Sequence, residues 1–205
     1  IKAPLASQID ASRVVLILLP EKPGKAQWAQ LAHGDILKNR YLQLKRQNKH
    51  ATRLVTDLPN KTGSHVILQT IGPQTPTFEL LTTARKLAAA IRTQDPAALL
   101  IQLAGFKADE ATRLVETMTA AILASVCPMP AYQADPSKAA SLERIDFYGL
   151  EDRIDLAAVQ AEIMGNHRAL WLSVLPPNVR TPAAYRKFVT QLAKTEGWQM
   201  TFLNT

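Results

Sequence analysis

The side chains best suited to chemistry in this sequence are its histidines and its lone cysteine. The four histidines are His33, His50, His65 and His167. None has another histidine three or four residues away, and none lies in an H-E-x-x-H motif. A metal site built from them would need side chains from distant segments. We therefore interpret each one as a surface residue or as a partner in a local hydrogen bond.

Cys127 lies between an apolar helical pattern and Pro128. A catalytic thiol needs a neighbouring base and a lowered pKa, and the flanking residues indicate neither. We interpret this thiol as structural. A single cysteine also excludes an intrachain disulfide and a zinc site made of several thiolates. This favours a reducing compartment, and we expect a cytoplasmic protein.

The eight glycines form neither G-x-G-x-x-G nor G-x-x-x-x-G-K-[ST], the motifs that cradle phosphates. Gly72 follows an expected strand and precedes an expected helix, which is where ligand loops lie in α/β sheets. One glycine there is also the ordinary way to turn the chain, and we favour that interpretation. No serine stands in G-x-S-x-G, the nucleophile motif of many hydrolases.

Acidic residues gather late in the chain, and paired carboxylates can act as acid and base. They are Glu143, Asp146, Glu151, Asp152 and Asp155. Arg144 and Arg153 are interleaved with them, which favours a surface charge network. The residues by themselves therefore predict no catalytic centre.

A basic segment without any carboxylate runs from residue 36 to residue 56 and supplies most of the net charge of +7. Its cations are Lys38, Arg40, Lys45, Arg46, Lys49 and Arg53. Such a segment could bind the phosphates of DNA. It could equally be a solvated helix face, which we favour. Tyr41 is the only aromatic residue in the segment, so a base-stacking platform is not indicated.

Hydrophobic patterning predicts the elements that would position these side chains. The apolar run SRVVLILL at 12–19 predicts a strand buried on both faces, and AALLIQLAG at 97–105 predicts a second buried strand. Residues 53–58 and 65–71 predict two strands joined by the PNKTG turn, and residues 142–148 predict another. The alternation of Trp198, Met200 and Phe202 predicts a last strand.

Helical spacing predicts helices at 26–47, broken near Gly34, and at 75–94, 109–126, 155–174 and 181–196. Thr75 and Asp109 are the expected caps of two of them. Residues 133–141 are small and polar and predict a loop. Strands interleaved with helices indicate an α/β fold with a mixed, largely parallel sheet flanked by helices. No apolar run reaches about 18 residues, so we expect no membrane-spanning helix.

The connector LPPNVRTPAAY, residues 175–185, separates the last two helical patterns. Pro176 and Pro177 cannot continue a helix, because each lacks an N–H and clashes with the preceding turn. Thr181 can cap the next helix with Pro182 in its first turn. Gly197 offers that helix a left-handed end.

With its flanks, ALWLSVLPPNVRTPAAYRKFVTQLAKTEGWQMTFLN, the connector resembles the segment that joins the two domains of the leucyl aminopeptidase (cytosol aminopeptidase) family. That segment carries the pattern N-x-P-P-N-x-x-T-P. Its second half is matched by Pro176, Pro177, Asn178, Thr181 and Pro182. The leading asparagine is absent, and WLS at 171–173 replaces the usual Arg-Asp-Leu.

Two segments upstream of the connector also resemble the family, and they occur in the same order along the chain. HVILQTIGPQTPTFELLTTARKLAAAI looks like the family's strand–glycine–helix unit. AAILASV, followed by Tyr132 and Lys138, resembles its helix-to-lysine stretch. The resemblance spans roughly residues 60–205.

The resemblance implies a macro-domain-like amino-terminal domain at 1–150, an interdomain linker helix at 151–176 and the start of a truncated catalytic domain at 177–205. It also implies a cytoplasmic metallo-exopeptidase that removes amino-terminal residues from peptides and assembles as a homohexamer. The family holds two divalent metals, Zn or Mn, with a lysine and the motifs D-S-G-G, A-D-M and N-T-D-A-E-G-R. None of these strings occurs here, so no catalytic or metal-binding residue is transferred. We expect this chain alone to be inactive, free of cofactor and monomeric.

Two alternatives remain open from the sequence. One is a macro-like module that binds a nucleotide-type ligand such as ADP-ribose at the loops of Gly72 and Gly105. The other is DNA binding by the basic segment, which some bacterial members of the resembled family also perform. If residues 177–205 begin a second domain, Tyr185, Phe188 and Trp198 are expected to lack their packing partners.

Overall fold

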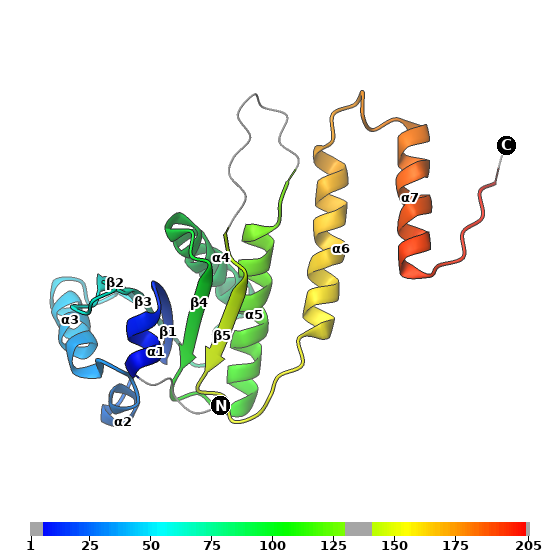
Figure 1. Cartoon of the computed structure of the whole chain (residues 1–205). Coiled ribbons are helices and arrows are strands. Elements are labelled where there is room, and N and C mark those ends of the chain that lie inside the picture. The colour runs from blue at the N-terminus through cyan, green and yellow to red at the C-terminus, as the bar shows by residue number, and fades with distance from the viewer. Residues whose placement is uncertain (1–5, 130–140, 204–205) are drawn as a thin grey trace. The chain divides into compact units, whose positions relative to one another are not determined.

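Five strands form one sheet in the order β2-β3-β1-β4-β5 (Figure 1). The computed structural model describes residues 6–129 and 141–203. The strands are β1 (Val14–Pro20), β2 (Arg53–Asp57), β3 (His65–Ile71), β4 (Ala98–Leu103) and β5 (Arg144–Tyr148). β1 pairs in parallel with β3 and β4, and β4 pairs in parallel with β5, whereas β2 is antiparallel to β3. The predicted α/β fold with a mixed, largely parallel sheet is confirmed.

The described helices are α1 (Ala6–Ala11), α2 (Lys25–Ala29), α3 (Gly34–Gln47), α4 (Thr77–Gln94), α5 (Ala108–Val126), α6 (Ala157–Val174) and α7 (Pro182–Glu196). Their order between the strands is the one the sequence predicts. Contacts divide the chain into two units. The first holds the sheet, helices α1 to α5 and the start of α6 up to Ile163, and the second holds the rest of α6 and α7. No helix among the described residues is long and apolar enough to cross a membrane.

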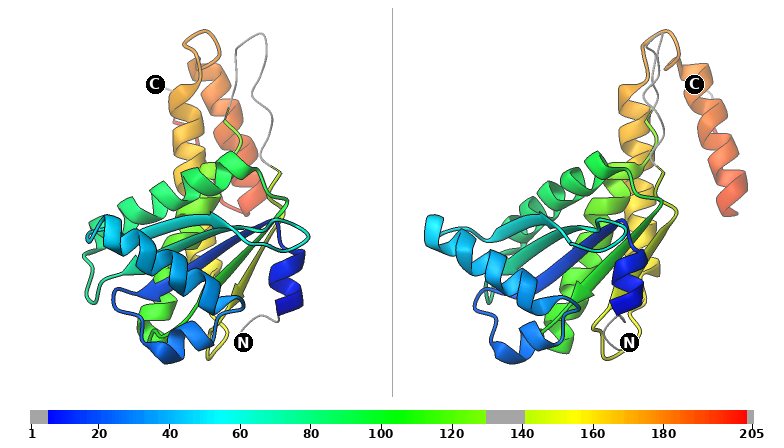
Figure 2. Two further views of the ribbon diagram at one scale, coloured as in Figure 1. Left: turned by 90° about the vertical axis from the view of Figure 1, so that its left-hand side faces the viewer. Right: turned by 60° about the vertical axis from the view of Figure 1, so that its left-hand side comes forward.

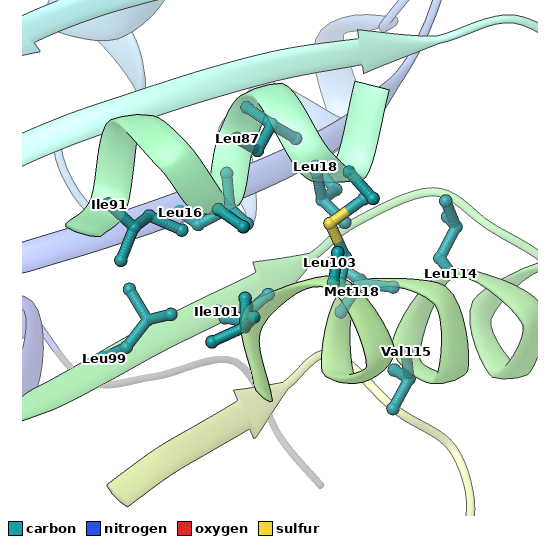
Figure 3. Packing of buried hydrophobic residues seen from close by; sticks show 14 of the residues in the cluster. Leu16, Leu18, Leu87, Ile91, Leu99, Ile101, Leu103, Leu114, Val115 and Met118 are labelled. Atoms are coloured by element: carbon teal, nitrogen blue, oxygen red, sulfur yellow. The ribbon is translucent and has the colours of Figure 1, made fainter. Parts of the chain in front are cut away.

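Two apolar clusters cover the two faces of the sheet. Odd residues of β4, such as Leu99 and Ile101, pack with Leu87 of α4 and Met118 of α5 (Figure 3). Even residues such as Leu100 belong to the cluster that includes side chains of α1, α2 and α3. Figure 2 shows helices on both sides of the sheet. Burial on both faces is why the central strand β1 is continuously apolar instead of alternating.

The break in the predicted helix 26–47 lies between α2 and α3 and requires Gly34. A Cβ atom at this position would lie 2.0 Å from the carbonyl oxygen of Trp28. His33 directly before it adopts a left-handed conformation with φ 59°. The close approach of two backbone segments therefore excludes any side chain at residue 34.

Three local predictions are wrong. Thr75 does not cap α4, because its hydroxyl donates to the carbonyl of Gly72 at 2.8 Å and the cap position is Pro76. Asp109 lies inside the first turn of α5, and the cap position is Lys107. No strand forms at 198–203, because alternation produces a strand only where a neighbouring strand completes the hydrogen bonds. The predicted loop at 133–141 lies outside the described residues except for Ser141, and Tyr132 and Lys138 lie outside them too.

Leu87→Ala should lower the free energy of unfolding by about 2–5 kcal/mol, because it removes a fully buried side chain and leaves a cavity. Leu81→Ala is the matched control on the same helix, since Leu81 is 39% exposed, and should change stability by about 0.5 kcal/mol or less. Urea unfolding followed by circular dichroism measures both variants. Equal losses would contradict the packing of α4 described here.

Candidate functional site

A cavity of about 340 Å³ opens at the carboxyl ends of the parallel strands β1 and β3. Its apolar walls come from the ends of both strands, from α4, from the segment after β4 and from α5. They are Pro20, Ile71, Leu80, Phe106 and Leu114. Ligands of open α/β sheets bind at this edge, because the connections there turn to opposite sides. The cavity is therefore the candidate functional site.

The turn between β3 and α4 forms one wall of the cavity. Thr75 Oγ1 donates to the carbonyl of Gly72 at 2.8 Å, and Gln74 adopts a left-handed φ of 55°. Arg113 Nη2 of α5 donates to the carbonyl of Thr75 at 2.9 Å and to Thr77 Oγ1 at 3.0 Å. Gly72 thus lies in a turn, as the sequence predicts, and it also lines the cavity.

Charged side chains of both signs surround the apolar walls. They are Glu21, Lys22, Glu110 and Arg113. A Cβ atom built on Gly72 would lie 3.9 Å from Glu21 Oε2, so the Glu21 carboxylate lies beside the turn. Among residues 6–129 and 141–203, none of these four side chains forms an ion pair. Sequence patterning missed this set, because the four residues belong to separate segments and form no motif.

Gly105, the second glycine considered for a ligand loop, has another role. It adopts φ 83°, and a Cβ atom there would lie 2.5 Å from Cγ of Gln27. Close packing of Gln27 accounts for this glycine, and Gly105 does not line the cavity. The loops of Gly72 and Gly105 therefore do not converge into a phosphate cradle.

The basic segment lies on α3 and at the start of β2. Arg40 donates to the hydroxyl of Thr56 and to the carbonyl of Asp57, so it holds α3 to the edge strand. Lys45 lies 5.6 Å from the centroid of the Tyr41 ring and donates to the carbonyl of Lys49. Lys38 is half-buried, whereas the side chains of Arg46, Lys49 and Arg53 are exposed.

Tyr41 itself is buried, with 4% of its surface exposed. Its ring packs against Trp28 at a centroid distance of 5.8 Å. The aromatic residue of the basic segment is therefore part of the core and offers no surface for base stacking.

Two histidines form local pairs with aspartates. His33 Nε2 lies 2.8 Å from Asp10 Oδ1, and His65 Nδ1 lies 2.7 Å from Asp57 Oδ1. Asn60 also donates to Asp10 Oδ1 at 2.8 Å. Hydrogen bonds with Asn60 and His33 hold the pKa of Asp10 below its usual value. The contacts of Asp10 join α1 to the loops before α3 and before β3, and the His65–Asp57 pair joins β3 to β2, so these contacts are structural.

No group of three or more His, Cys, Asp or Glu side chains that could hold a metal ion occurs in the part of the chain that the structure describes. Burial raises the pKa of the Cys127 thiol, which opposes formation of a nucleophilic thiolate. In the acidic cluster, Arg144 Nε pairs with Asp146 Oδ2 at 3.0 Å, and Asp155 Oδ1 accepts from the backbone N–H of Ala157 at 2.9 Å. These contacts fit the predicted surface network better than an acid/base pair.

The connector between α6 and α7 has the geometry that its prolines predict. α6 ends at Val174, and the backbone N–H groups of Val179 and Arg180 both donate to the carbonyl of Pro176 at 2.9 Å. Thr181 Oγ1 accepts from the N–H of Ala184 at 3.2 Å and caps α7. The turn between α6 and α7 is therefore made by Pro176, Pro177, Asn178, Thr181 and Pro182.

The second unit has few internal contacts of its own. The rings of Trp171 and Phe188 stack at 5.5 Å, and Arg168 Nη2 pairs with Glu196 Oε1 at 2.7 Å. Tyr185 and Trp198 remain 52% and 58% exposed. Tyr185 and Trp198 are thus more than half exposed, whereas Phe188 packs on Trp171.

Comparison with known proteins finds similarity in fold. No family model and no curated protein sequence matches the chain. A mutant of tomato leucine aminopeptidase superposes with a TM-score of 0.69 at 15% identity, covering 91% of this chain and 40% of that one. The bottromycin maturation enzyme BotP superposes with a TM-score of 0.59 at 17% identity, covering 91% of this chain and 38% of BotP. BotP in complex with Mn gives a TM-score of 0.55 at 16% identity, covering 91% and 37%.

Thr181→Ala should destabilise α7 by about 0.5–2 kcal/mol, because the first turn loses its side-chain acceptor. Thr190→Ala is the matched control in the middle of the same helix. The hydroxyl of Thr190 donates only to the carbonyl of Arg186, four residues earlier, and alanine has the higher helix propensity. Thermal unfolding followed by circular dichroism should separate the two variants, and a loss of helix in Thr190→Ala alone would contradict the capping role.

Proposed function

We propose that this chain is the amino-terminal part of a leucyl-aminopeptidase-like metallo-exopeptidase, which removes amino-terminal residues from peptides. The observation that carries the proposal is the similarity in fold to leucine aminopeptidase over 91% of this chain. The matched connector at residues 176–182 supports it independently, because it turns between two helices as a domain connector should. In this proposal residues 1–150 form the amino-terminal domain, 151–176 the linker and 177–205 the start of the catalytic domain.

The described residues of this chain do not fit the two-metal centre that such an enzyme needs. Peptide hydrolysis with two metals requires clustered carboxylates to hold both ions and to activate a water, and no such cluster occurs at 6–129 or 141–203. We therefore assign both metals, Zn or Mn, and the contacts with peptide to a further domain of the parent enzyme. The BotP structure in complex with Mn supports manganese.

Exposed apolar side chains of the second unit support the same proposal. Leu170, Val174, Tyr185 and Trp198 are between 43% and 58% exposed. Large apolar patches at a surface commonly mark contacts with another domain or protein. The proposal assigns these side chains to packing against the catalytic domain of a cytoplasmic homohexamer.

The 205-residue chain should not hydrolyse leucyl p-nitroanilide with added Mn²⁺ or Zn²⁺, because no cluster of metal ligands occurs at residues 6–129 or 141–203. A protein that continues through the codons after Thr205 should hydrolyse it, and EDTA should abolish that activity. The test is release of p-nitroaniline by both proteins at equal concentration. An extended reading frame without the lysine and carboxylate motifs, or an extended protein that is folded but inactive, would refute the proposal.

DNA binding is a second candidate function. It rests on Arg46, Lys49 and Arg53, which are exposed and form no ion pair with any other described residue. Such cations are free to release counterions from phosphates, which gives salt-dependent affinity.

The triple variant Arg46→Gln, Lys49→Gln and Arg53→Gln should weaken a gel shift with duplex DNA. The slope of log affinity against log salt should fall by about 0.9 for each phosphate contact that is lost. The control removes the same charge from other exposed positions with Lys61→Gln, Arg85→Gln and Lys86→Gln. No shift at low salt, or equal weakening in both triple variants, would remove this candidate.

A further inference from the structure

The cavity at the ends of β1 and β3 is small and mostly apolar inside. Its volume of about 340 Å³ is at the lower end of the usual range of about 300–1,000 Å³ for ligand pockets. Ile71, Leu80 and Leu114 are buried and form its base, and Phe106 is half-buried beside them. Such a surface favours a branched or aromatic group of modest size.

The polar part of the cavity offers both a cation and an anion. Arg113 uses Nη2 for the carbonyl of Thr75 and the hydroxyl of Thr77, which orients its guanidinium against the turn. Its other nitrogens have no hydrogen-bond partner among the described residues, so they can donate to a ligand carboxylate. Glu21, which follows β1, lies beside Gly72 of that turn and can accept from a ligand ammonium group.

The formal charges around the cavity cancel. Lys22 and Arg113 supply two positive charges, and Glu21 and Glu110 supply two negative charges. A neutral rim with separated charges gives no advantage to a diphosphate, whose charge would need a net positive site. It suits a molecule that carries one positive and one negative group.

We propose that this cavity binds a free amino acid with an apolar side chain, such as leucine. The side chain packs on Ile71, Leu80 and Leu114. Arg113 binds the α-carboxylate, and Glu21 binds the α-ammonium group. All the residues that form the site belong to the first unit, so the binding does not depend on a further domain.

This site has a consequence that rests on the proposed peptidase function. An aminopeptidase releases free amino acids, so the site would bind a product away from the metals. The binding and the peptidase proposal can fail separately, because binding is measured on the 205-residue chain without any assay of hydrolysis.

Isothermal titration calorimetry of the full chain tests the site with leucine and with two analogues that each lack one charged group. 4-Methylpentanoate lacks the ammonium group, and 3-methylbutylamine lacks the carboxylate. Leucine should give a heat signal that fits binding at a single site. Both analogues should bind with an affinity at least about tenfold lower, because each leaves one charged side chain of the site without a partner. Glycine should also bind weakly, because it has no side chain to cover the apolar base.

Arg113→Gln and Glu21→Gln should each weaken leucine binding by about ten- to hundredfold. Their charge-matched controls are Arg85→Gln on the exposed face of α4 and Glu162→Gln on α6, which should bind as the unsubstituted chain does. Glu21 makes no hydrogen bond with another described residue, so Glu21→Gln keeps the test valid if Arg113→Gln disturbs the turn. Circular dichroism establishes that each variant is folded.

Three results would overturn the proposal. The first is the absence of heat with leucine at millimolar concentration in the folded chain. The second is leucine binding that is unchanged in both Arg113→Gln and Glu21→Gln. The third is binding of 4-methylpentanoate or ADP-ribose as tight as that of leucine, which would assign the cavity to organic anions or nucleotides.

Discussion

Complete burial of β1 is the constraint on which the first unit depends. Its residues 14–19 are at most 2% exposed, and it pairs in parallel with a strand on each side. A parallel strand buried on both faces needs helices above and below the sheet, together with connections long enough to return to the same edge. The helices α4 and α5 on one face and α1 to α3 on the other meet this need.

The cavity is one consequence of this topology. β3 leads through α4 to β4 on the far side of β1, so the turn at 72–75 and the start of α5 meet beyond the end of β1. Side chains there cannot all pack on the sheet, because the sheet ends at Pro20 and Ile71. Arg113 holds the turn from α5. The cavity therefore has an apolar base and charged groups at its rim. The glycines of the fold form no phosphate cradle.

The second unit depends much less than the first on burial of apolar side chains. Among its described residues only Ala193 is buried. The contacts within the unit include the stack of Trp171 on Phe188, the Arg168–Glu196 pair and the approach of the Arg186 guanidinium to the Phe202 ring at 4.3 Å. Helices that bury so little surface gain most of their stability from capping and from packing of their exposed apolar side chains against another domain or protein. The proposed function therefore assigns the exposed apolar side chains of these helices to packing against a further domain. The chain spans 40% of the length of the tomato leucine aminopeptidase mutant that it resembles in fold.

The sequence by itself determined the local elements: the apolar runs at 14–20 and 98–103, the helix at 77–94 and the cap and prolines around Thr181. These depend on patterns of neighbouring residues, which a sequence shows directly. It also indicated the breaks at Gly34 and Gly197. Tertiary structure decided whether 198–203 could become a strand. The backbone hydrogen bonds of a strand need a neighbouring strand, and alternation of apolar residues does not supply one. It also decided that Glu21, Gly72 and Arg113 line one cavity, since only the crossing of β1 by distant segments brings them together.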